Sequence, residues 1–455
     1  MKNCMSVWYA LNSTANLETK NVDIITLGCS KNLVDSERLM GCLESVGCCC
    51  RHDPDELMGE IAVVNTCGFI GDAKEESINT ILSLASRKAD TQSPLQELYV
   101  MGCLSQRYRD ELQAEIPEVD GWFGKFDYLE LAKHIADKAG VACPTDAAAR
   151  HITTPGHYAY IKISEGCNRM CSYCAIPLIT GHHVSRPMEE ILDEMRMLIR
   201  QGVKEFNIIA QDLSSYGLDL YHKQCLSELV EKMAQLDGIE WIRLHYAYPT
   251  DFPDGLTRVM ARYPQVCKYL DIALQHCTDR MLSLMHRRIT RKEQDDLIAR
   301  IRSEVPGIVI RTTLMTGHPG ETEEDFEELK QWIQTMRFER MGVFAYSDED
   351  GTYANLHYAD DIPQATKQAR VDELMAIQQD ISSNILQQMV GTVQRIVIDR
   401  QEGGYFIGRT QYDSPDVDCE VLLKQNDPRN RHCRIGEFYN VTIIKSEAFD
   451  LYATL

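Results

Sequence analysis

The chain has 455 residues and carries 47 Lys and Arg against 68 Asp and Glu, a formal charge of −21. With 44% hydrophobic and 25% charged residues it has the composition of a globular, soluble protein, which excludes a disordered or fibrous chain. The length predicts two to four domains. Because nucleic acids are bound largely through Lys and Arg, such an acidic surface favours a basic or a small partner.

Seventeen cysteines are an odd number, so they cannot all pair as disulfides, and they require a chemical explanation. The first twenty residues hold no apolar run long enough for a signal peptide, and no window approaches the roughly 18 apolar residues of a membrane span. We therefore expect a cytoplasmic protein with no membrane partner, whose cysteines are metal ligands, catalytic groups or core residues. Small core residues are expected at Cys42, Cys225, Cys267 and the run Cys48-Cys49-Cys50.

Residues 22–137 alternate between β-rich runs and helical stretches, which predicts a parallel α/β domain with crossover helices. Strands are predicted at 24–27, 61–64 and 98–100, and the helices that follow them at 35–46, at 72–87 and up to Leu112. Each strand ends next to a cysteine, namely Cys29, Cys67 and Cys103.

These three cysteines share one structural position, just beyond the carboxyl end of a strand. Ligands of open α/β sheets bind there. Residues far apart in sequence meet there. Any one of the three is equally well explained as a buried small residue that closes a strand. Three thiolates together would leave a tetrahedral metal, or one iron of a cubane cluster, with an open position.

Residues 138–156, which include Cys143-Pro144 and Thr153-Thr154-Pro155-Gly156, are typical of a linker. Six candidate strands follow, at 158–163, 205–210, 241–245, 269–274, 308–314 and 341–346. Helical patterns separate them, for example at 188–200 and 323–336, and a last helix is predicted at about 365–390. Six β/α units predict a partial (β/α)6 TIM-like barrel over residues 153–388, with an active site at the carboxyl ends of its strands.

From residue 391 the pattern changes to short strands with glycine-rich turns, at 393–398, 405–408, 419–423 and 438–444. This pattern predicts that residues 391–455 form a small all-β domain, an antiparallel barrel or sandwich.

The sharpest motif is a group of three cysteines with the spacing C-x3-C-x2-C, formed by Cys167, Cys171 and Cys174 directly after the first strand of the predicted barrel. Three thiolates in so short a loop can hold three irons of a 4Fe-4S cluster and leave the fourth open to a chelating ligand. A structural zinc site would need a fourth ligand, and no Cys or His stands at a comparable spacing. We predict a 4Fe-4S cluster here, with zinc as the alternative.

This loop resembles that of the radical S-adenosylmethionine (SAM) superfamily. Together with the segments Gly28-Cys29-Ser30, Asn65-Thr66-Cys67-Gly68 and Gly102-Cys103-Leu104, it resembles the methylthiotransferases of that superfamily. The resemblance runs from Asp23 to Leu455 and leaves the first twenty residues as an extension or a misplaced start. It implies a methylthiotransferase domain at 22–137, a radical SAM core at 153–388 and an OB-like TRAM domain at 391–455.

The chemistry that the resemblance implies needs cofactors, because no side-chain acid or base can deprotonate an unactivated C–H bond. It implies two 4Fe-4S clusters and SAM. The cluster of the C-x3-C-x2-C loop would cleave SAM to a 5′-deoxyadenosyl radical. A second cluster, held by Cys29, Cys67 and Cys103, would deliver sulfur that a second SAM methylates. An electron donor such as flavodoxin or ferredoxin is implied as well.

Six residues at the strand ends of the barrel are candidates for the SAM pocket or for substrate contact: Gln211, Gln275, Gly317, Gly320, Glu321 and Arg186. The two glycines would let the backbone approach the cofactor closely. Glu321 is equally well explained as the start of the next helix, where a carboxylate suits the dipole. Arg186 could face a carboxylate or form an ordinary surface pair. Beyond the cluster ligands, no catalytic residue is assigned.

Two branches of the family differ in substrate. The tRNA branch typically has Tyr-Ser-Pro-Arg-Pro-Gly-Thr after the sixth strand, where this chain has Tyr346-Ser347-Asp348-Glu349-Asp350-Gly351-Thr352. From residue 391 onward the chain has 8 basic against 10 acidic residues, which would hold RNA poorly. Both features resemble the branch that methylthiolates the β-carbon of an aspartate in small-subunit ribosomal protein uS12.

We therefore expect a transferase that acts on uS12, free or in the small ribosomal subunit, with no direct tRNA substrate. An acidic segment with Asp413, Asp416, Asp418 and Glu420 would attract a basic ribosomal protein, unless it is merely a solvated loop. The alternatives are a tRNA (adenosine) methylthiotransferase and a non-enzymatic iron-sulfur protein.

Overall fold

The structure, a computed structural model, describes residues 20–141, 144 and 150–455. The expected N-terminal extension and residues 142–143 and 145–149 of the expected linker therefore lie outside the described residues. The chain forms two compact units, one built mostly from residues before 152 and the other from residues 152–455 with two short earlier segments. No helix of the described residues has the length and apolar character to cross a bilayer.

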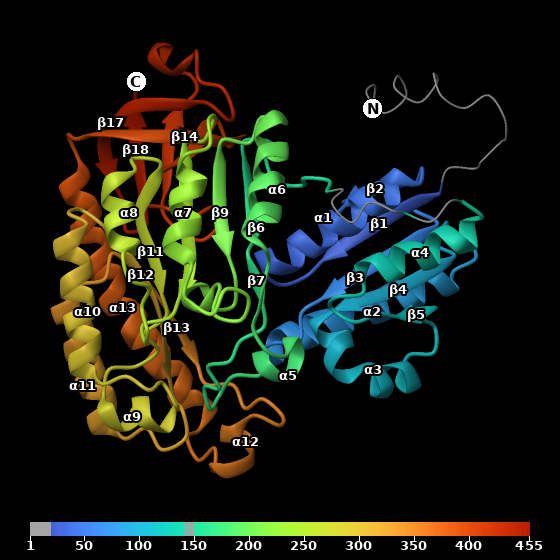
Figure 1. The fold of residues 1–455 in the computed structure, drawn as a ribbon, viewed down its shortest axis with the longest axis horizontal. Helices are drawn as coiled ribbons and strands as arrows, with labels where there is room; N and C mark the ends of the chain where they lie inside the picture. The colour runs from blue at the N-terminus through green and yellow to red at the C-terminus, as the bar shows by residue number, and fades with distance from the viewer. Residues whose placement is uncertain (1–19, 142–143, 145–149) are drawn as a thin grey trace. The chain divides into compact units, whose positions relative to one another are not determined.

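A five-stranded parallel sheet forms the core of the first unit, in the order β2-β1-β3-β4-β5. Its strands are β1 (Asn21–Thr26), β2 (Cys49–His52), β3 (Ile61–Thr66), β4 (Glu97–Gly102) and β5 (Gly121–Trp122), and its helices are α1 (Ser30–Ser45), α2 (Gly71–Ala89), α3 (Cys103–Glu115) and α4 (Tyr128–Ala139) (Figure 1). Alternate residues of the central strand β3 pack on opposite faces, with Val63 in one apolar layer and Val64 in the other.

The three predicted strands and helices of this unit are confirmed, with differences at their ends. The first helix begins at Ser30 rather than at 35, directly after Cys29. Strands β2 and β5 and helix α4 were not predicted. Because β2 is an edge strand, Cys49 is exposed, contrary to the expectation of a core residue. Cys42, Cys225 and Cys267 are buried as expected.

The second unit contains a six-stranded parallel sheet in sequential order from β6 to β13, which curls into a partial barrel. The strands are β6 (Tyr158–Lys162), β9 (Glu205–Ile209), β10 (Trp241–Ala247), β11 (Val266–Ile272), β12 (Val309–Thr316) and β13 (Arg340–Ala345). All six predicted strands are confirmed.

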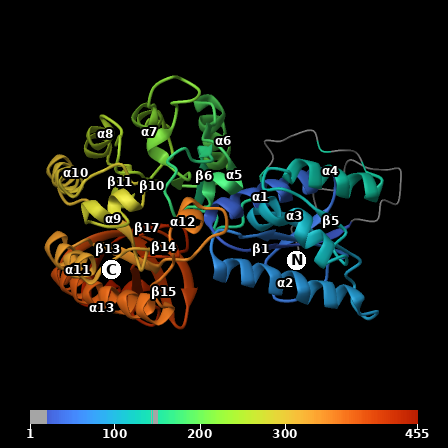
Figure 2. The same ribbon diagram turned by 90° about the horizontal axis from the view of Figure 1, so that it is seen from below.

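Helices cover the outer face of this barrel (Figure 2). They are α6 (Met188–Arg200), α7 (Leu226–Ala234), α8 (Leu256–Arg262), α10 (Arg291–Glu304), α11 (Glu323–Met336) and α13 (Gln364–Met389). Their apolar faces and the outward side chains of the strands form the largest core of the protein, in which Phe206, Ile242 and Trp332 are buried.

The last part of the chain forms a closed barrel in the order β14-β15-β16-β18-β17. Its strands are β14 (Val393–Glu402), β15 (Tyr405–Thr410), β16 (Glu420–Lys424), β17 (Phe438–Ser446) and β18 (Asp450–Thr454). Only β18 was not predicted. These three parts confirm the predicted fold class: a parallel α/β domain, a partial (β/α)6 barrel and a small all-β domain.

Buried ion pairs join the small β-barrel to the amino ends of the strands of the large barrel. Glu205, the first residue of β9, pairs with Arg243 of β10 and with Arg409 of β15. Arg340, the first residue of β13, pairs with Asp413 at 2.5 Å. A buried cation needs a buried counter-charge, so these contacts fix which face of the small barrel packs against the large one.

The same contacts correct the expectation that the acidic segment attracts a partner. Asp413 is only 1% exposed and holds Arg340. Asp418 accepts a hydrogen bond from the Tyr269 hydroxyl at 2.8 Å and pairs with Arg311. Glu420 is half-buried and pairs with Arg400. Two of the four carboxylates therefore face the large barrel because its arginines require them, and they are not available to a basic protein.

Replacing Arg409 with Met should destabilise the second unit by about 3 kcal/mol, because the carboxylates of Glu205 and Asp399 would each lose a cationic partner inside the protein. Urea unfolding followed by circular dichroism measures this change. The matched control is Arg395→Met, whose pair with Glu240 joins the same two barrels but is exposed, so it should cost less than about 1 kcal/mol. Equal effects of the two substitutions would contradict the account.

Candidate functional site

A short two-stranded ladder closes the base of the loop that carries Cys167, Cys171 and Cys174. Its strands β7 (Ser164–Glu165) and β8 (Val184–Ser185) pair in antiparallel fashion. Gly166 has φ +76°, and a Cβ placed there would lie 2.0 Å from the carbonyl oxygen of His182. Only glycine fits at this position, which explains the Gly166-Cys167 sequence at the start of the motif.

The middle of the loop is attached to the segments that follow β11, β12 and β13. Ser172 donates its backbone N–H to the carbonyl of Met285 at 3.1 Å and accepts one from Ala354 at 2.7 Å. Its buried hydroxyl lies 3.1 Å from Nε2 of His318. The position of the two last cysteines is thus set by contacts with three other strand ends.

The three thiols are half-buried and form no disulfide. Burial raises the pKa of Cys167 to about 11 and raises the pKa of Cys174 further. A bound cation would reverse this by stabilising the thiolates. Within the described part of the chain, no group of three His, Cys, Asp or Glu residues converges on one metal ion. A 4Fe-4S cluster does not require such convergence, because each thiolate binds a different iron.

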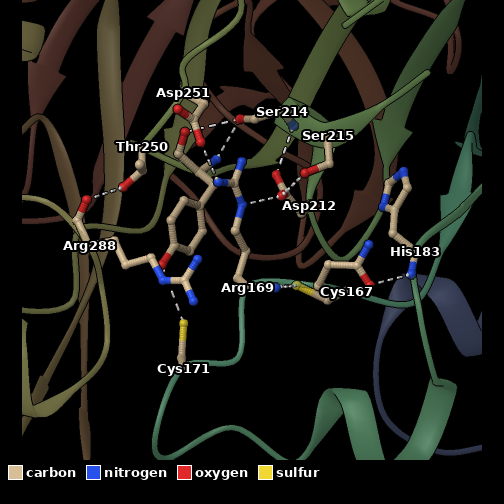
Figure 3. A network of polar contacts seen from close by, with 12 residues as sticks. Cys167, Arg169, Cys171, His183, Asp212, Ser214, Ser215, Thr250, Asp251 and Arg288 are labelled. Atoms are coloured by element: carbon tan, nitrogen blue, oxygen red, sulfur yellow. Dashed lines mark hydrogen bonds and ion pairs between the residues drawn. The ribbon is translucent and has the colours of Figure 1, made fainter. Parts of the chain in front are cut away.

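Arg169 ties the loop to the segments after β9 and β10 (Figure 3). Its Nε donates to Asp212 at 2.7 Å and its Nη1 to Asp251 at 3.0 Å, while its backbone N–H donates to the Cys167 sulfur at 3.5 Å. Asp212 is buried and also accepts from the backbone of Ser214 and the hydroxyl of Ser215. These carboxylates neutralise the Arg169 charge.

A tyrosine and a second arginine lie against Cys171. The Tyr248 hydroxyl is 3.5 Å and the Arg287 Nη1 is 3.4 Å from the Cys171 sulfur. Both Arg169 and Arg287 lie over the Tyr248 ring, with guanidinium carbons 4.3 and 4.0 Å from its centroid. Burial works against the charge of Arg287, whereas its neighbours Tyr173, Tyr248 and Cys171 raise its pKa.

Sequence reasoning missed these residues. Tyr248 stands directly after β10, at the same kind of strand end as the candidates that were named. Arg287 precedes Arg288 in a tandem arginine pair just before Thr290, the cap of α10. The strand-end position of Tyr248 and the tandem arginine pair are both visible in the sequence, but neither shows which side chain reaches the loop. A cavity of about 350 Å³ opens beside them, lined in part by Arg169, Tyr248 and Arg288.

Three of the predicted SAM-pocket residues lie at strand ends. Gln211 follows β9 and donates to Glu165 at 2.7 Å, and its own Oε1 is buried with no hydrogen-bond partner in the described residues. Gln275 adopts φ +70° and bridges to β12 through its backbone. Arg186 pairs with Glu194 at 2.7 Å and donates to the carbonyl of Lys162. It therefore does face a carboxylate, and this carboxylate belongs to the protein itself.

The segment from Gly317 to Glu321 forms a tight turn after β12. Gly317 has φ +77°, and a Cβ there would meet the Lys367 side chain at 2.4 Å. Gly320 has φ +85°. Glu321 accepts from the Gly317 N–H at 2.7 Å and pairs with Arg370 at 2.5 Å.

Glu321 therefore anchors the turn from within the protein. Burial opposes its ionisation, but hydrogen bonds from His276, Gly317 and Thr316 lower its pKa. It does not start the next helix, because α11 begins at Glu323 after the Thr322 cap.

The second set of cysteines follows three neighbouring strands of the N-terminal sheet. Cys29 comes after β1, Cys67 directly after β3, and Cys103 directly after β4. The Cys29 carbonyl accepts the first hydrogen bonds of α1, and Cys103 is the first residue of α3. Gly102 before it has φ +106°, and a Cβ there would lie 2.5 Å from the Thr66 carbonyl oxygen, so glycine is required.

Family models match most of the described chain. The model of the radical SAM superfamily matches residues 161–333, that of the TRAM domain residues 390–455, and that of the uncharacterized protein family UPF0004 residues 21–124. The fold and the three-cysteine loop, with these matches, define the class: a radical SAM protein that carries a TRAM domain.

Similar proteins extend over nearly the whole chain. The ribosomal protein uS12 methylthiotransferase RimO of Phocaeicola vulgatus is 57% identical over 439 residues, which are 96% of this chain and 100% of that protein. The protein of the same name from Bacteroides thetaiotaomicron is 56% identical over 96% of this chain and 99% of its own length. That of Flavobacterium johnsoniae is 49% identical, again over 96% and 99%. The chain belongs to the family of the ribosomal protein uS12 methylthiotransferases.

A solved structure with a similar fold is the radical SAM methyltransferase TsrM from Kitasatospora setae, described with cobalamin and a [4Fe-4S] cluster bound. It has a TM-score of 0.53 and 15% identity and covers 92% of this chain and 84% of that chain. At this identity the likeness supports the fold alone.

Replacing Glu321 with Gln should destabilise the protein by roughly 3 kcal/mol, because buried Arg370 would lose its buried carboxylate partner and keep only the exposed Glu323. Urea unfolding under argon measures the change. The matched control is Glu324→Gln, an exposed carboxylate three residues along the same segment, which should leave the unfolding midpoint nearly unchanged. An unchanged unfolding midpoint for Glu321→Gln would show that this carboxylate is not an anchor.

Proposed function

We propose that this protein methylthiolates the β-carbon of an aspartate in ribosomal protein uS12 by a radical SAM reaction. The observation that carries the proposal is the three-cysteine loop of a radical SAM barrel in a chain that is 57% identical to a uS12 methylthiotransferase along its whole length. The chemistry requires a radical, since the β-carbon of an aspartate side chain has no proton acidic enough for a side-chain base.

Cys167, Cys171 and Cys174 are the proposed ligands of the first 4Fe-4S cluster. Their loop is closed by Gly166, and the Cys171 thiol lies beside Arg287 and Tyr248, which suits an anionic group bound by thiolates. When bound, the cluster supplies the electron that cleaves SAM to the radical. The chain's own part is to hold SAM and the substrate in place and to keep water from the radical.

Gln211, Gln275, Gly317, Gly320 and Arg186 are the proposed neighbours of SAM. The buried Oε1 of Gln211 is an acceptor with no partner in the described residues, which suits an ammonium or hydroxyl donor of a ligand. The backbone turns at Gly317 and Gly320 with positive φ, and the space beside Gly317 that a Cβ would take is occupied by the side chain of Lys367. Glu321 supports this segment from behind, through its hydrogen bond to Gly317.

Cys29, Cys67 and Cys103 are the proposed ligands of the second cluster. Their positions after three neighbouring strands support a common site at one edge of the sheet. When bound, this cluster supplies the sulfur that is transferred. The segments that carry these cysteines begin helices α1 and α3, whose amino ends favour negative ligands.

Charge supports a basic protein as substrate rather than tRNA. Asp348 and Asp350 follow the last strand of the barrel and are exposed, whereas Glu349 between them is only 3% exposed. Two exposed carboxylates at the end of the barrel that carries the cluster loop would repel RNA phosphates and attract a basic ribosomal protein.

The remaining assignments are part of the same proposal. The domain limits are 22–137, 153–388 and 391–455, which the family models at 21–124, 161–333 and 390–455 support. The protein acts in the cytoplasm on uS12, free or in the small subunit, and receives electrons from a donor such as flavodoxin or ferredoxin.

Protein reconstituted with iron and sulfide without oxygen should hold about eight irons per chain, and replacement of Cys29, Cys67 and Cys103 with Ala should leave about four. Iron and sulfide analysis measures this. The matched control replaces Cys48, Cys49 and Cys50 with Ala, three other cysteines from the first 137 residues, and should keep about eight. A full iron content in the first variant would contradict the ligand assignment.

Reconstituted protein with SAM and a reductant should add the mass of one methylthio group to uS12, placed by peptide mass spectrometry on an aspartate. Unfractionated tRNA in a parallel reaction should gain none. Replacing Cys174 with Ala should abolish the addition, because the cluster loop would lose a ligand. Modified tRNA together with unmodified uS12 would overturn the choice of substrate.

A further inference from the structure

Buried arginines in this protein are paired with carboxylates, with one exception. Six arginines of the described residues are buried: Arg150, Arg243, Arg287, Arg340, Arg370 and Arg409. Five of them have an ion pair with a buried carboxylate, namely Glu37, Glu205, Asp413, Glu321 and again Glu205. Arg287 has no carboxylate within ion-pair distance among the described residues.

The contacts of Arg287 are neutral groups and a sulfur. The side chain is 2% exposed, and its Nη2 donates to the carbonyl of Ala273. Its Nη1 lies 3.3 Å from the Tyr173 hydroxyl and 3.4 Å from the Cys171 sulfur. Its Nε is buried and has no hydrogen-bond partner in the described part of the chain. The guanidinium therefore has an incomplete set of partners.

Arg169, the other arginine over Tyr248, shows the contrast. Its charge is neutralised by Asp212 and Asp251, and its side chain holds the loop to the barrel. Arg287 has the same ring contact but no such acid. An unpaired buried cation costs several kcal/mol, so its retention beside a cysteine needs an anion that the side chains do not supply.

We infer that the counter-charge of Arg287 is the iron-sulfur cluster bound through Cys171, and that Arg287 raises the reduction potential of this cluster. The inference rests on the proposed assignment of Cys167, Cys171 and Cys174 as its ligands. Reduction adds one electron and hence one negative charge to the cluster. A guanidinium in contact with the ligand sulfur stabilises the reduced form more than the oxidised form, which makes reduction of the cluster accessible to a weaker donor.

Arg287 acts through a ligand sulfur and is thus a positioning and tuning residue. The contact with Cys171 predicts that replacing Arg287 has opposite effects on stability in the protein without the cluster and in the protein with it. Without the cluster, the buried charge is uncompensated, and an apolar side chain of similar length would be neutral or stabilising. With the cluster, the same substitution removes an ion contact.

The test uses the full chain with Cys29, Cys67 and Cys103 replaced by Ala, so that one cluster is titrated. In this parent, Arg287→Met, Arg287→Lys and the control Arg288→Met are compared. Arg288 is the adjacent arginine, and its side chain is exposed. Each protein is reduced stepwise with dithionite or titanium citrate at fixed potentials, and the reduced cluster is followed by electron paramagnetic resonance.

Arg287→Met should lower the midpoint potential, Arg287→Lys should shift it less because the charge is kept, and Arg288→Met should leave it unchanged. Thermal unfolding should show Arg287→Met equal to or above the parent as apoprotein and below it when loaded. Failure of Arg287→Met to load iron while Arg287→Lys loads supports the same conclusion, since it isolates the charge.

Equal midpoint potentials for the parent and Arg287→Met would overturn the inference. So would equal shifts in Arg287→Met and Arg288→Met, or loss of iron in both Arg287 variants, because lysine keeps the charge. A parent that binds no iron would instead refute the ligand assignment in the proposed function, and it would do so before any Arg287 variant is compared.

Discussion

The close approach of Gly166 to the carbonyl of His182 is the contact on which the site depends. Because Gly166 has no side chain, the chain can fold back directly after the first barrel strand and close a loop over its carboxyl end. The first thiol of the motif is placed at this closure. Ser172 then ties the middle of the loop to the segments after three other strands, and the remaining two thiols follow from that. The loop is thus held at its base by the closure at Gly166 and at its middle by the hydrogen bonds of Ser172.

Charge is the second organising feature, and many of the charged side chains pair with one another inside the protein. The net charge of −21 suggests an acidic exterior, but several carboxylates are needed to neutralise arginines at the amino ends of the barrel strands. Asp413 and Asp418 belong to this set and join the two barrels. Other acids, such as Asp348 and Asp350 at the opposite end of the barrel strands, are exposed at the surface.

The sequence predicts the parts of the fold and site that rest on local patterns. Alternating apolar runs indicate the six barrel strands, and the spacing of Cys167, Cys171 and Cys174 indicates a cluster without any knowledge of the fold. Cys29, Cys67 and Cys103 could be grouped because each follows a strand. Short edge strands such as β2 were missed because its cysteine-rich sequence, Cys49–His52, has no apolar alternation.

Contacts between distant residues could not be predicted in the same way. Arg287 touches Cys171 from 116 residues away, and Tyr248 touches it from 77 residues away. Nothing in the local sequence of Arg287 distinguishes it from Arg288, which is exposed. The sequence predicts that Glu321 contacts SAM or starts a helix, because only the folded chain shows that Arg370 reaches it. Such pairings depend on the topology of the barrel, which brings strand ends together.

We expect a radical formed at this loop to take a hydrogen atom from an aspartate β-carbon of uS12. The most direct measurement uses uS12 with deuterium at the β-carbons of its aspartates, incubated with the reconstituted protein, SAM and a reductant. Mass spectrometry of the 5′-deoxyadenosine formed should show deuterium in proportion to methylthiolated uS12. Unlabelled 5′-deoxyadenosine alongside methylthiolated uS12 would contradict the account.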